Sequence, residues 1–229
     1  TWALPGGAAS VRAARRNAFA LLSELGLLEH PGAARLLDSL DEQTRSVTAT
    51  MIERGINSPR TSSMGRLFDA AAAIQGICDS HLEGEPAIEL EAAAWRALDT
   101  EIAHFPDDNA GYFASGPSWL DGPYVLDQKA LFEALLGGIE AGAPADRLAL
   151  GFHIAVARSS ARIASDICVH EGIDTVALSG GVFMNRLLLQ LLTRELKTRG
   201  LTVLIPQTVP VNDGCIAYGQ AAVASARLA

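Results

Sequence analysis

The sequence predicts a helix-rich α/β fold that contains at least one parallel βαβ unit. Two apolar runs, residues 175–178 and 203–205, are typical of buried parallel strands, and a helical pattern from about 184 to 199 separates them. Strand, helix and strand in this order form a crossover connection, so we expect the two strands to be parallel. Elsewhere the apolar residues recur mostly at helical spacing, which makes helix the main element.

Residues 1–145 are expected to be mostly helical. An extended segment at 2–4 runs into a turn at 5–7, and residues 57–63 form a polar loop. Asp41 and Asp127 stand where N-cap residues belong, and Gly55 stands where a helix C-terminal glycine belongs. From 100 to 126 the scattered Pro and Gly residues permit only a strand at 123–126. Helices are predicted over residues 8–28, 33–39, 42–54, 63–77, 86–98, 128–139 and 145–170.

Residues 146–229 are expected to form a βαβ unit followed by a helix that starts at Asp213. Sheets in globular proteins usually have about four to six strands, so two strands predict that the rest of the sheet lies upstream of Thr1. The absence of an initiator methionine agrees with a chain cut from a longer protein. An incomplete sheet leaves an edge and apolar surface exposed, and we therefore expect either a homodimer or poor solubility.

Composition excludes several classes of protein. The net charge of −8 argues against a nucleic-acid surface, which needs clustered cations. No apolar run approaches the roughly 20 residues that span a membrane. Three cysteines without a CxxC pair fit a reducing compartment, so we expect a cytoplasmic protein.

A glycine loop follows the first predicted strand. Gly180 and Gly181 allow the backbone to approach a ligand closely, and the helix that follows offers unpaired N–H groups that suit a phosphate. Asn185, one turn later, could hydrogen-bond a nucleotide or substrate. The alternative is a simple tight turn, because a bare Ser-Gly-Gly is weak evidence.

A second loop, Asn212-Asp213-Gly214-Cys215, follows the second strand and should lie beside the first at one sheet edge. Asp213 could bind a hard cation, although an Asx turn or N-cap is the more frequent role of such a residue. Cys215 has no histidine placed to activate it, so nucleophilic catalysis is not expected.

Carboxylates near two helix starts form the third pattern. Asp69 follows a serine pair and a glycine, and Glu85 and Glu89 lie in the segment Glu-Gly-Glu-Pro-Ala-Ile-Glu. Carboxylates at such positions can accept hydrogen bonds from ribose hydroxyls. From the spacing alone, capping boxes with solvated acids are the more frequent explanation. The five histidines do not cluster, and His153 is expected to be a hydrogen-bonded core or groove residue.

In order, six segments of the chain resemble the C-terminal part of the carbamoyltransferase HypF family of hydrogenase maturation. They are LPGG at 4–7, ERGINSP at 53–59, TSSMGRLFDA at 61–70, EGEPAIELEA at 83–92, LSGGVFMNRLL at 178–188 and P-x-NDG-x-x-x-x-GQ at 210–220. Each segment is weak alone, but together they span nearly the whole chain. The resemblance implies an actin-like ATPase (ASKHA) fold, shared with the tRNA threonylcarbamoyltransferases.

The resemblance also implies ligands for the residues that match. Asp69, Glu85 and Glu89 would lie at the ribose side of ATP, and its phosphates or the acyl group would be flanked by Gly180, Gly181 and Asn185. Asp213 would be a ligand of a divalent metal ion, either zinc, iron or magnesium. In the family, carbamoyl phosphate and ATP yield a carbamoyl-adenylate. The carbamoyl group is then transferred to the C-terminal cysteine of the partner protein HypE, and dehydration gives the cyanide of the nickel–iron centre.

Two departures from the family pattern matter. The family's metal-binding histidines lie upstream of this segment, and Cys215 stands where glycine is usual. We therefore expect the isolated chain to bind metal weakly and not to turn over.

Two alternatives remain open. A relative that carbamoylates a small-molecule hydroxyl or threonylcarbamoylates tRNA is one, although the acidic balance argues against tRNA. The other is a non-catalytic docking module for a protein partner.

Overall fold

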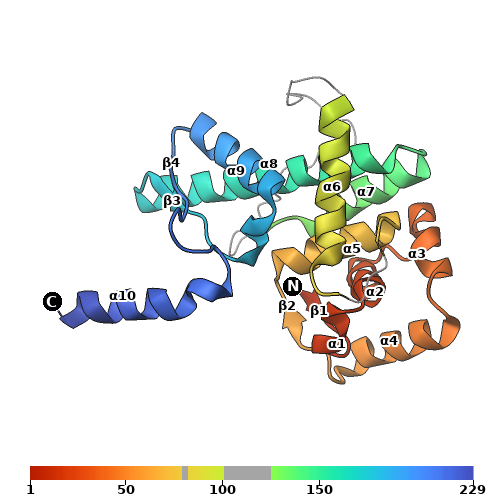
Figure 1. Ribbon diagram of the computed structural model, residues 1–229. Coiled ribbons are helices and arrows are strands. Elements are labelled where there is room, and N and C mark those ends of the chain that lie inside the picture. Colours follow the sequence, from red (N-terminus) through yellow and green to blue (C-terminus); the bar gives the residue numbers. More distant parts are fainter. Residues whose placement is uncertain (79–81, 101–124, 229) are drawn as a thin grey trace. The chain divides into compact units, whose positions relative to one another are not determined.

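The computed structural model describes residues 1–78, 82–100 and 125–228, the side chains of 99 and 100 excepted, and divides into two compact units (Figure 1). The units are Thr1–Ala155 and Val156–Ala229. The boundary falls inside the long helix α8 (Ala145–Glu171) rather than at 145/146. Of the predicted strand at 123–126, residues 125 and 126 have no regular structure and the others lie outside the described residues.

The first unit consists of short and medium-length helices and one small strand pair. Before α8 its elements are β1 (Trp2–Ala3), α1 (Ala8–Val11), α2 (Ala14–Leu25), the 3-10 turn η1 (Pro31–Ala33), α3 (Ala34–Asp38), α4 (Glu42–Arg54), β2 (Arg60–Thr61), α5 (Met64–Gln75), α6 (Glu85–Thr100) and α7 (Gln128–Glu140). Asp41 and Asp127 accept hydrogen bonds from Thr44 N and Ala130 N, so the predicted N-caps are confirmed.

The predicted helix over 8–28 is wrong, because the chain breaks it into α1 and α2. Ala13 has φ −132° and ψ 74°, which are not helical angles. The Ser10 hydroxyl donates a hydrogen bond to the carbonyl oxygen of Pro5, in the turn before α1. Gly26 ends α2 early in the left-handed conformation, at φ 71°. The apolar spacing continues across both interruptions, so periodicity alone could not locate them.

The predicted polar loop at 57–63 contains a strand. Arg60–Thr61 pair antiparallel with Trp2–Ala3, in the register Trp2↔Thr61. Trp2 is 1% exposed, and its indole Nε1 donates to Asn17 Oδ1 at 2.8 Å. The pairing depends on these distant partners, which no local pattern reveals.

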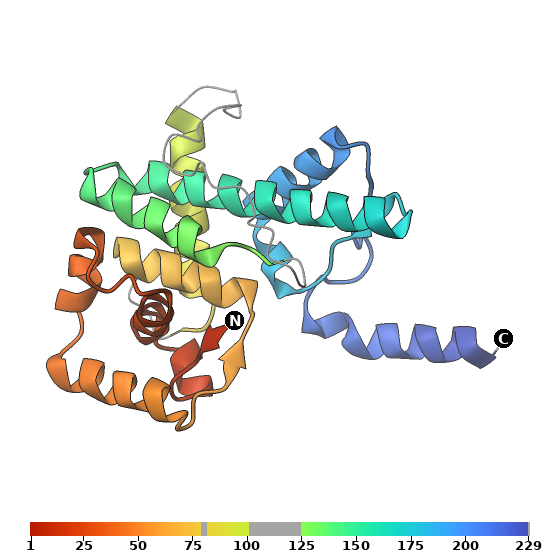
Figure 2. The ribbon, with the colours of Figure 1, turned by 180° about the vertical axis from the view of Figure 1, so that it is seen from behind.

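Helix α5 forms the centre of the first unit. It packs against α2, α3, α6 and α7, and Figure 2 shows it between α2 and α7. Its run of four alanines, residues 70–73, is at most 4% exposed, and small side chains allow neighbouring helices to approach closely. Phe68 and Phe132 each meet Phe152 edge to face, with ring centroids 5.4 and 5.7 Å apart, which adds aromatic contacts to an aliphatic core.

The second unit contains the predicted βαβ crossover. After the end of α8 its elements are β3 (Thr175–Ala177), η3 (Gly181–Met184), α9 (Arg186–Thr198), β4 (Thr202–Leu204), η4 (Asp213–Cys215) and α10 (Ile216–Leu228). β3 and β4 are parallel, with Val176 opposite Val203, so the predicted strand direction is confirmed. Five leucines of α9 are buried, as expected for a crossover helix: Leu187, Leu188, Leu191, Leu192 and Leu196.

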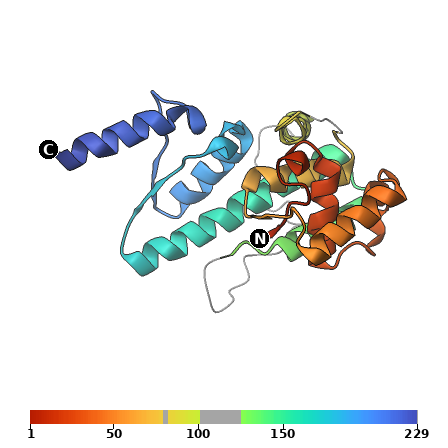
Figure 3. The same cartoon turned by 90° about the horizontal axis from the view of Figure 1, so that it is seen from below.

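The prediction that both strands are buried is wrong for the residues described. Thr175 and Ala177 are exposed, Val176 is half-buried, and Leu204 is 54% exposed. Helix α10 has no buried residue, and Figure 3 shows it extending away from β3 and β4 to the C-terminus. The apolar runs have the composition of covered strands, but α9 covers only part of their surface. The homodimer stays a prediction.

No helix in the described ranges combines the length and the hydropathy that crossing a bilayer requires.

The contact between η1 and α7 generates a first prediction. A Cβ on Gly32 would clash with the carbonyl oxygen of Leu136 and lie 2.9 Å from its Cα, so Gly32→Ala must push η1 away from α7. We expect it to lower the free energy of unfolding by about 1–3 kcal/mol, the usual cost of overpacking. Urea unfolding measures this change.

Gly137→Ala is the matched control, placed in α7 itself. A Cβ there meets nothing within 4 Å, and alanine is the better helix former, so we expect a gain of about 0.5–1 kcal/mol. Equal effects of the two substitutions would contradict the close approach at Gly32.

Candidate functional site

The two loops predicted to bind a ligand meet in the second unit. Gly180, at φ 115°, donates its backbone N–H to the carbonyl of Val211 at 2.7 Å. Because this bond joins the loop after β3 to the loop after β4, the expected convergence at the carboxyl ends of the strands is confirmed. A residue with a side chain would be strained at this φ, which explains why glycine occupies position 180.

The glycine loop continues into η3 and then α9. The first N–H groups of such a turn, here those of Gly181 and Val182, have no acceptor within the turn itself. Asn185 caps α9, its Oδ1 accepting the N–H of Leu188 at 2.8 Å. Its side-chain carbonyl is therefore occupied in this conformation.

Asn212 is a residue that the sequence reasoning missed as a cap. Its Oδ1 accepts the Gly214 N–H at 3.1 Å, and its Nδ2 donates to Met184 Sδ at 3.3 Å. The N-cap of η4 is thus Asn212, whereas the sequence pattern places it at Asp213. The signal was available, since Asn-Asp-Gly offers two residues that favour Asx turns.

Asp213 is exposed at the start of η4. Within the part of the chain that the structure describes, no group of three or more His, Cys, Asp or Glu side chains could hold a metal ion. A single carboxylate does not complete a divalent metal site, so the described residues alone do not fit such an ion. The role of Asp213 as a metal ligand stays a prediction.

The predicted ribose carboxylates lie in the first unit. Asp69 is 2% exposed and forms an ion pair with Arg66, Oδ2 to Nη2, at 2.9 Å. Its Oδ1 has no hydrogen-bond partner among the described residues. Burial raises the pKa of Asp69 to about 6, against the opposing effects of Arg66 and of the Ala87 backbone amide.

Glu85 and Glu89 lie at the start of α6, which packs on α5. Glu85 is the first residue of the helix and half-buried, and Glu89, four residues later on the same side, is exposed. Asp69 lies on α5, which packs against α6, and the amide of Ala87 in the first turn of α6 contributes to the pKa of Asp69. Ser63 caps α5 through Arg66 N at 3.4 Å, so the capping alternative also holds for that helix.

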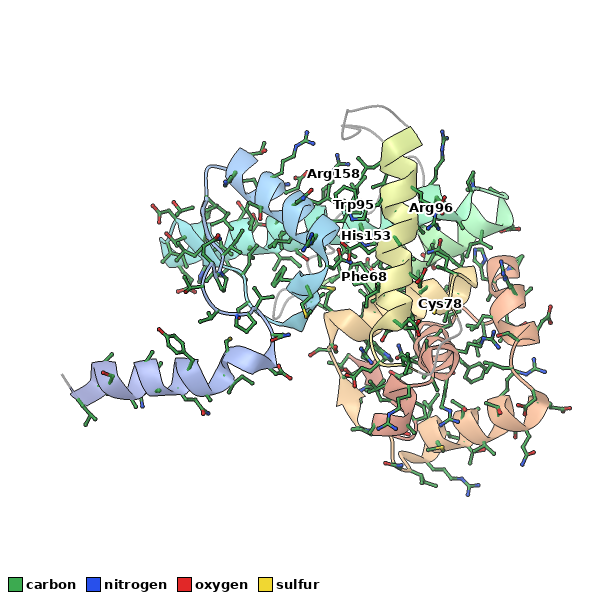
Figure 4. The ribbon with its side chains drawn as sticks, viewed as in Figure 1. Phe68, Cys78, Trp95, Arg96, His153 and Arg158 are labelled. Atoms are coloured by element: carbon green, nitrogen blue, oxygen red, sulfur yellow. The ribbon has the colours of Figure 1, made fainter. Side chains whose placement is uncertain are left out.

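His153 is a core residue, as expected. It is 0% exposed, its Nδ1 bonds Ala149 O at 2.8 Å, and its ring meets Phe68 with centroids 4.9 Å apart (Figure 4). Burial lowers the pKa of His153 to about 4, so the ring is neutral at pH 7.

Comparison with known proteins identifies the family. Residues 1–220 match the family described as carbamoyltransferase, Kae1-like domain, second subdomain. The chain belongs to the HypF carbamoyltransferase family. It is 37% identical over 225 residues to the carbamoyltransferase HypF homolog of Cupriavidus necator, and 35% identical over 218 residues to carbamoyltransferase HypF of Rhodobacter capsulatus.

Two solved structures share the fold. Full-length HypF in its phosphate- and nucleotide-bound form matches all of this chain with a TM-score of 0.84 and 28% identity. HypF of T. kodakarensis matches 99% of the chain with a TM-score of 0.78 and 28% identity. The predicted family and the predicted helix-rich fold with a parallel pair are therefore confirmed.

The chain spans only part of these relatives. The match covers 97% of this chain and 55% of the Cupriavidus homolog, and 93% of this chain and 25% of the Rhodobacter protein. Of the two solved chains, it covers 28% and 29%. The activity, substrates and partners of the full-length relatives therefore apply to this chain only as a proposal.

The two buried titratable groups generate a second prediction, because their pKa values shift in opposite directions. The pKa of Asp69 is raised from 3.8 to about 6, so its contribution to stability is fully present below pH 3.8 and is lost as the pH rises through about 6. The pKa of His153 is lowered from 6.5 to about 4, so its contribution is present above pH 6.5 and is lost as the pH falls toward 4. Each amounts to about 3 kcal/mol at most.

Single substitutions should separate these two effects. In Asp69→Asn only His153 remains, so the free energy of unfolding should fall as the pH falls from about 6.5 to 4. In His153→Gln only Asp69 remains, so the free energy of unfolding should rise as the pH falls over a similar range. Urea unfolding of both variants across this range measures the slopes, and slopes of the same sign would refute the assignment.

Proposed function

We propose that this chain is part of a carbamoyltransferase that acts on a carbamoyl-adenylate made from carbamoyl phosphate and ATP. The acceptor is the thiol of the C-terminal cysteine of HypE, in the maturation of nickel–iron hydrogenase. Membership of the HypF family supports the reaction class. A solved HypF that holds phosphate and nucleotide supports a nucleotide as the ligand.

The bond from Gly180 N to Val211 O is the single observation that carries the proposal furthest. It joins two loops at the carboxyl ends of parallel strands, the position where α/β proteins usually bind nucleotides. The N–H groups of Gly181 and Val182 suit the phosphate of an adenylate, since they have no acceptor within η3 and are free of the helix ladder. Asp69, Glu85 and Glu89 are proposed for the ribose side.

The chemistry asked of these groups is positioning. The thiolate of the acceptor attacks the carbamoyl carbon, a C–S bond forms, the C–O bond to the phosphate breaks, and AMP leaves with the electron pair. The thiol proton passes to solvent water before the attack. Backbone N–H groups that hold the phosphate stabilise the charge that grows on it and fix the distance between the reacting atoms.

Nucleotide binding tests the proposal directly. We expect calorimetric titration of the purified chain to show binding of AMP and ATP, measured with and without a divalent metal. Asn185→Ala removes both a ligand contact and the cap of α9, and the lost cap alone costs about 1 kcal/mol of stability.

Asn185→Ser separates the two roles, because serine caps a helix nearly as well as asparagine. If Asn185 contacts the nucleotide, both variants should bind AMP more weakly than the unchanged chain. If it acts only as a cap, only the alanine variant should differ. A folded chain that binds neither AMP nor ATP would overturn the proposed function.

A further inference from the structure

Asn212 lies between the two loops of the candidate site and contacts both of them. Its Oδ1 accepts the backbone N–H of Gly214 at 3.1 Å, within its own loop. Its Nδ2 donates to Sδ of Met184 at 3.3 Å, in the glycine loop 28 residues earlier. A Cβ on Gly181 would lie 4.0 Å from the Asn212 Cβ, in ordinary van der Waals contact. The side chain of Asn212 therefore lies directly beside the glycine loop.

The Gly214 N–H decides which way the Asn212 amide points. A backbone N–H can only donate, so the oxygen of the amide must face it. A thioether sulfur is a weak acceptor and donates nothing, so the nitrogen of the amide must face Met184. Both neighbours thus require the same orientation, and one side chain forms both hydrogen bonds.

The glycine loop is consequently attached at both ends to consecutive residues. The turn η3 begins after Gly180, whose N–H donates to the carbonyl of Val211 at 2.7 Å, and it ends at Met184, the acceptor of the Asn212 amide. The backbone between these two attachments is positioned by the two residues that come directly before Asp213.

The exposure of Met184 argues against a packing role for its side chain. It is 63% exposed, so the side chain gains little from burial. Its sulfur nevertheless lies within hydrogen-bond distance of the Asn212 amide. This contact between the loops is therefore the contribution of Met184 that the geometry supports.

Resting on the nucleotide site proposed above, we propose that Asn212 is a positioning residue for the phosphate of the nucleotide, with Met184 as its partner. By bonding both loops, Asn212 sets the distance between the glycine loop and the carboxylate of Asp213. The two loops then bind the phosphate as one unit, because their separation is fixed before the ligand arrives. Preorganisation of this kind raises affinity, since less freedom is lost on binding.

The contact between the loops can be tested without a ligand. Met184→Leu keeps an apolar side chain of similar size but removes the acceptor, whereas Met184→Gln supplies a carbonyl oxygen, which is a stronger acceptor than sulfur. In NMR spectra, the side-chain amide protons of Asn212 should exchange with water faster in Met184→Leu, and as slowly as in the unchanged chain, or more slowly, in Met184→Gln. Val169→Leu, at an 80% exposed position on α8 outside both loops, is the control and should change nothing.

Calorimetric titration with AMP tests the positioning role. Met184→Leu should weaken AMP binding by about threefold, the size of one weak hydrogen bond, and Met184→Gln should bind AMP as the unchanged chain does. Asn212→Ser keeps a cap for η4 but is too short to reach Met184, so it should lose a similar amount. The chain that carries both Asn212→Ser and Met184→Leu should lose no more than either single variant, because both changes break the same contact.

The outcomes separate this proposal from the proposed function. Amide protons of Asn212 that exchange equally fast in Met184→Leu and in the unchanged chain would overturn the contact, whether or not the chain binds nucleotide. AMP binding that survives Met184→Leu unchanged, or losses that add in the double variant, would overturn the positioning role and leave the proposed function intact. An unchanged chain that binds no AMP would overturn the proposed function and the positioning role together, while the exchange rates would still decide whether the contact forms.

Discussion

Close packing around α5 is the constraint on which the first unit depends. The alanines at 70–73 are at most 4% exposed. Because their side chains are so small, α2 and α6 pack directly against this helix. Dispersion contacts of this kind are individually small and collectively large. The direction of α5 in turn decides where Arg66 and Asp69 stand, in the turn that precedes the alanines.

The core of the first unit also contains two ionisable side chains, Asp69 and His153, whose pKa values shift in opposite directions. Phe68 lies beside both of them, next to Asp69 in the chain and in ring contact with His153. Burial disfavours the charged form of each group, which raises the pKa of the acid and lowers that of the base. Their contributions to stability thus change in opposite directions over nearly the same interval of pH. A chain that carries both is less sensitive to pH than either residue alone would make it.

Much of the architecture could be predicted from the sequence, and the failures have physical causes. The caps at Asp41 and Asp127 and the crossover around α9 follow from local chemistry and apolar period, so they were predicted correctly. The pairing of β1 with β2 was not, because it joins segments that lie far apart along the chain, and the indole of Trp2 also bonds a distant residue, Asn17. For the candidate site, the meeting of the two loops was predicted, because the carboxyl ends of parallel strands lie at one edge of a sheet. The burial of Asp69 was not, since solvent access depends on α6 packing over it.

The register of β1 with β2 has a consequence for the order in which the chain can assemble. Trp2 pairs with Thr61, so α1, α2, α3 and α4 all lie between the two strands. A contact between residues so distant along the chain forms slowly, because the loop that closes it must first lose its freedom. The parallel pair of β3 and β4 likewise requires α9 to be present before it can form. During synthesis, β1 can therefore pair with β2 only after α1, α2, α3 and α4 have been made. The indole of Trp2 lacks its native partner, Asn17, until α2 folds.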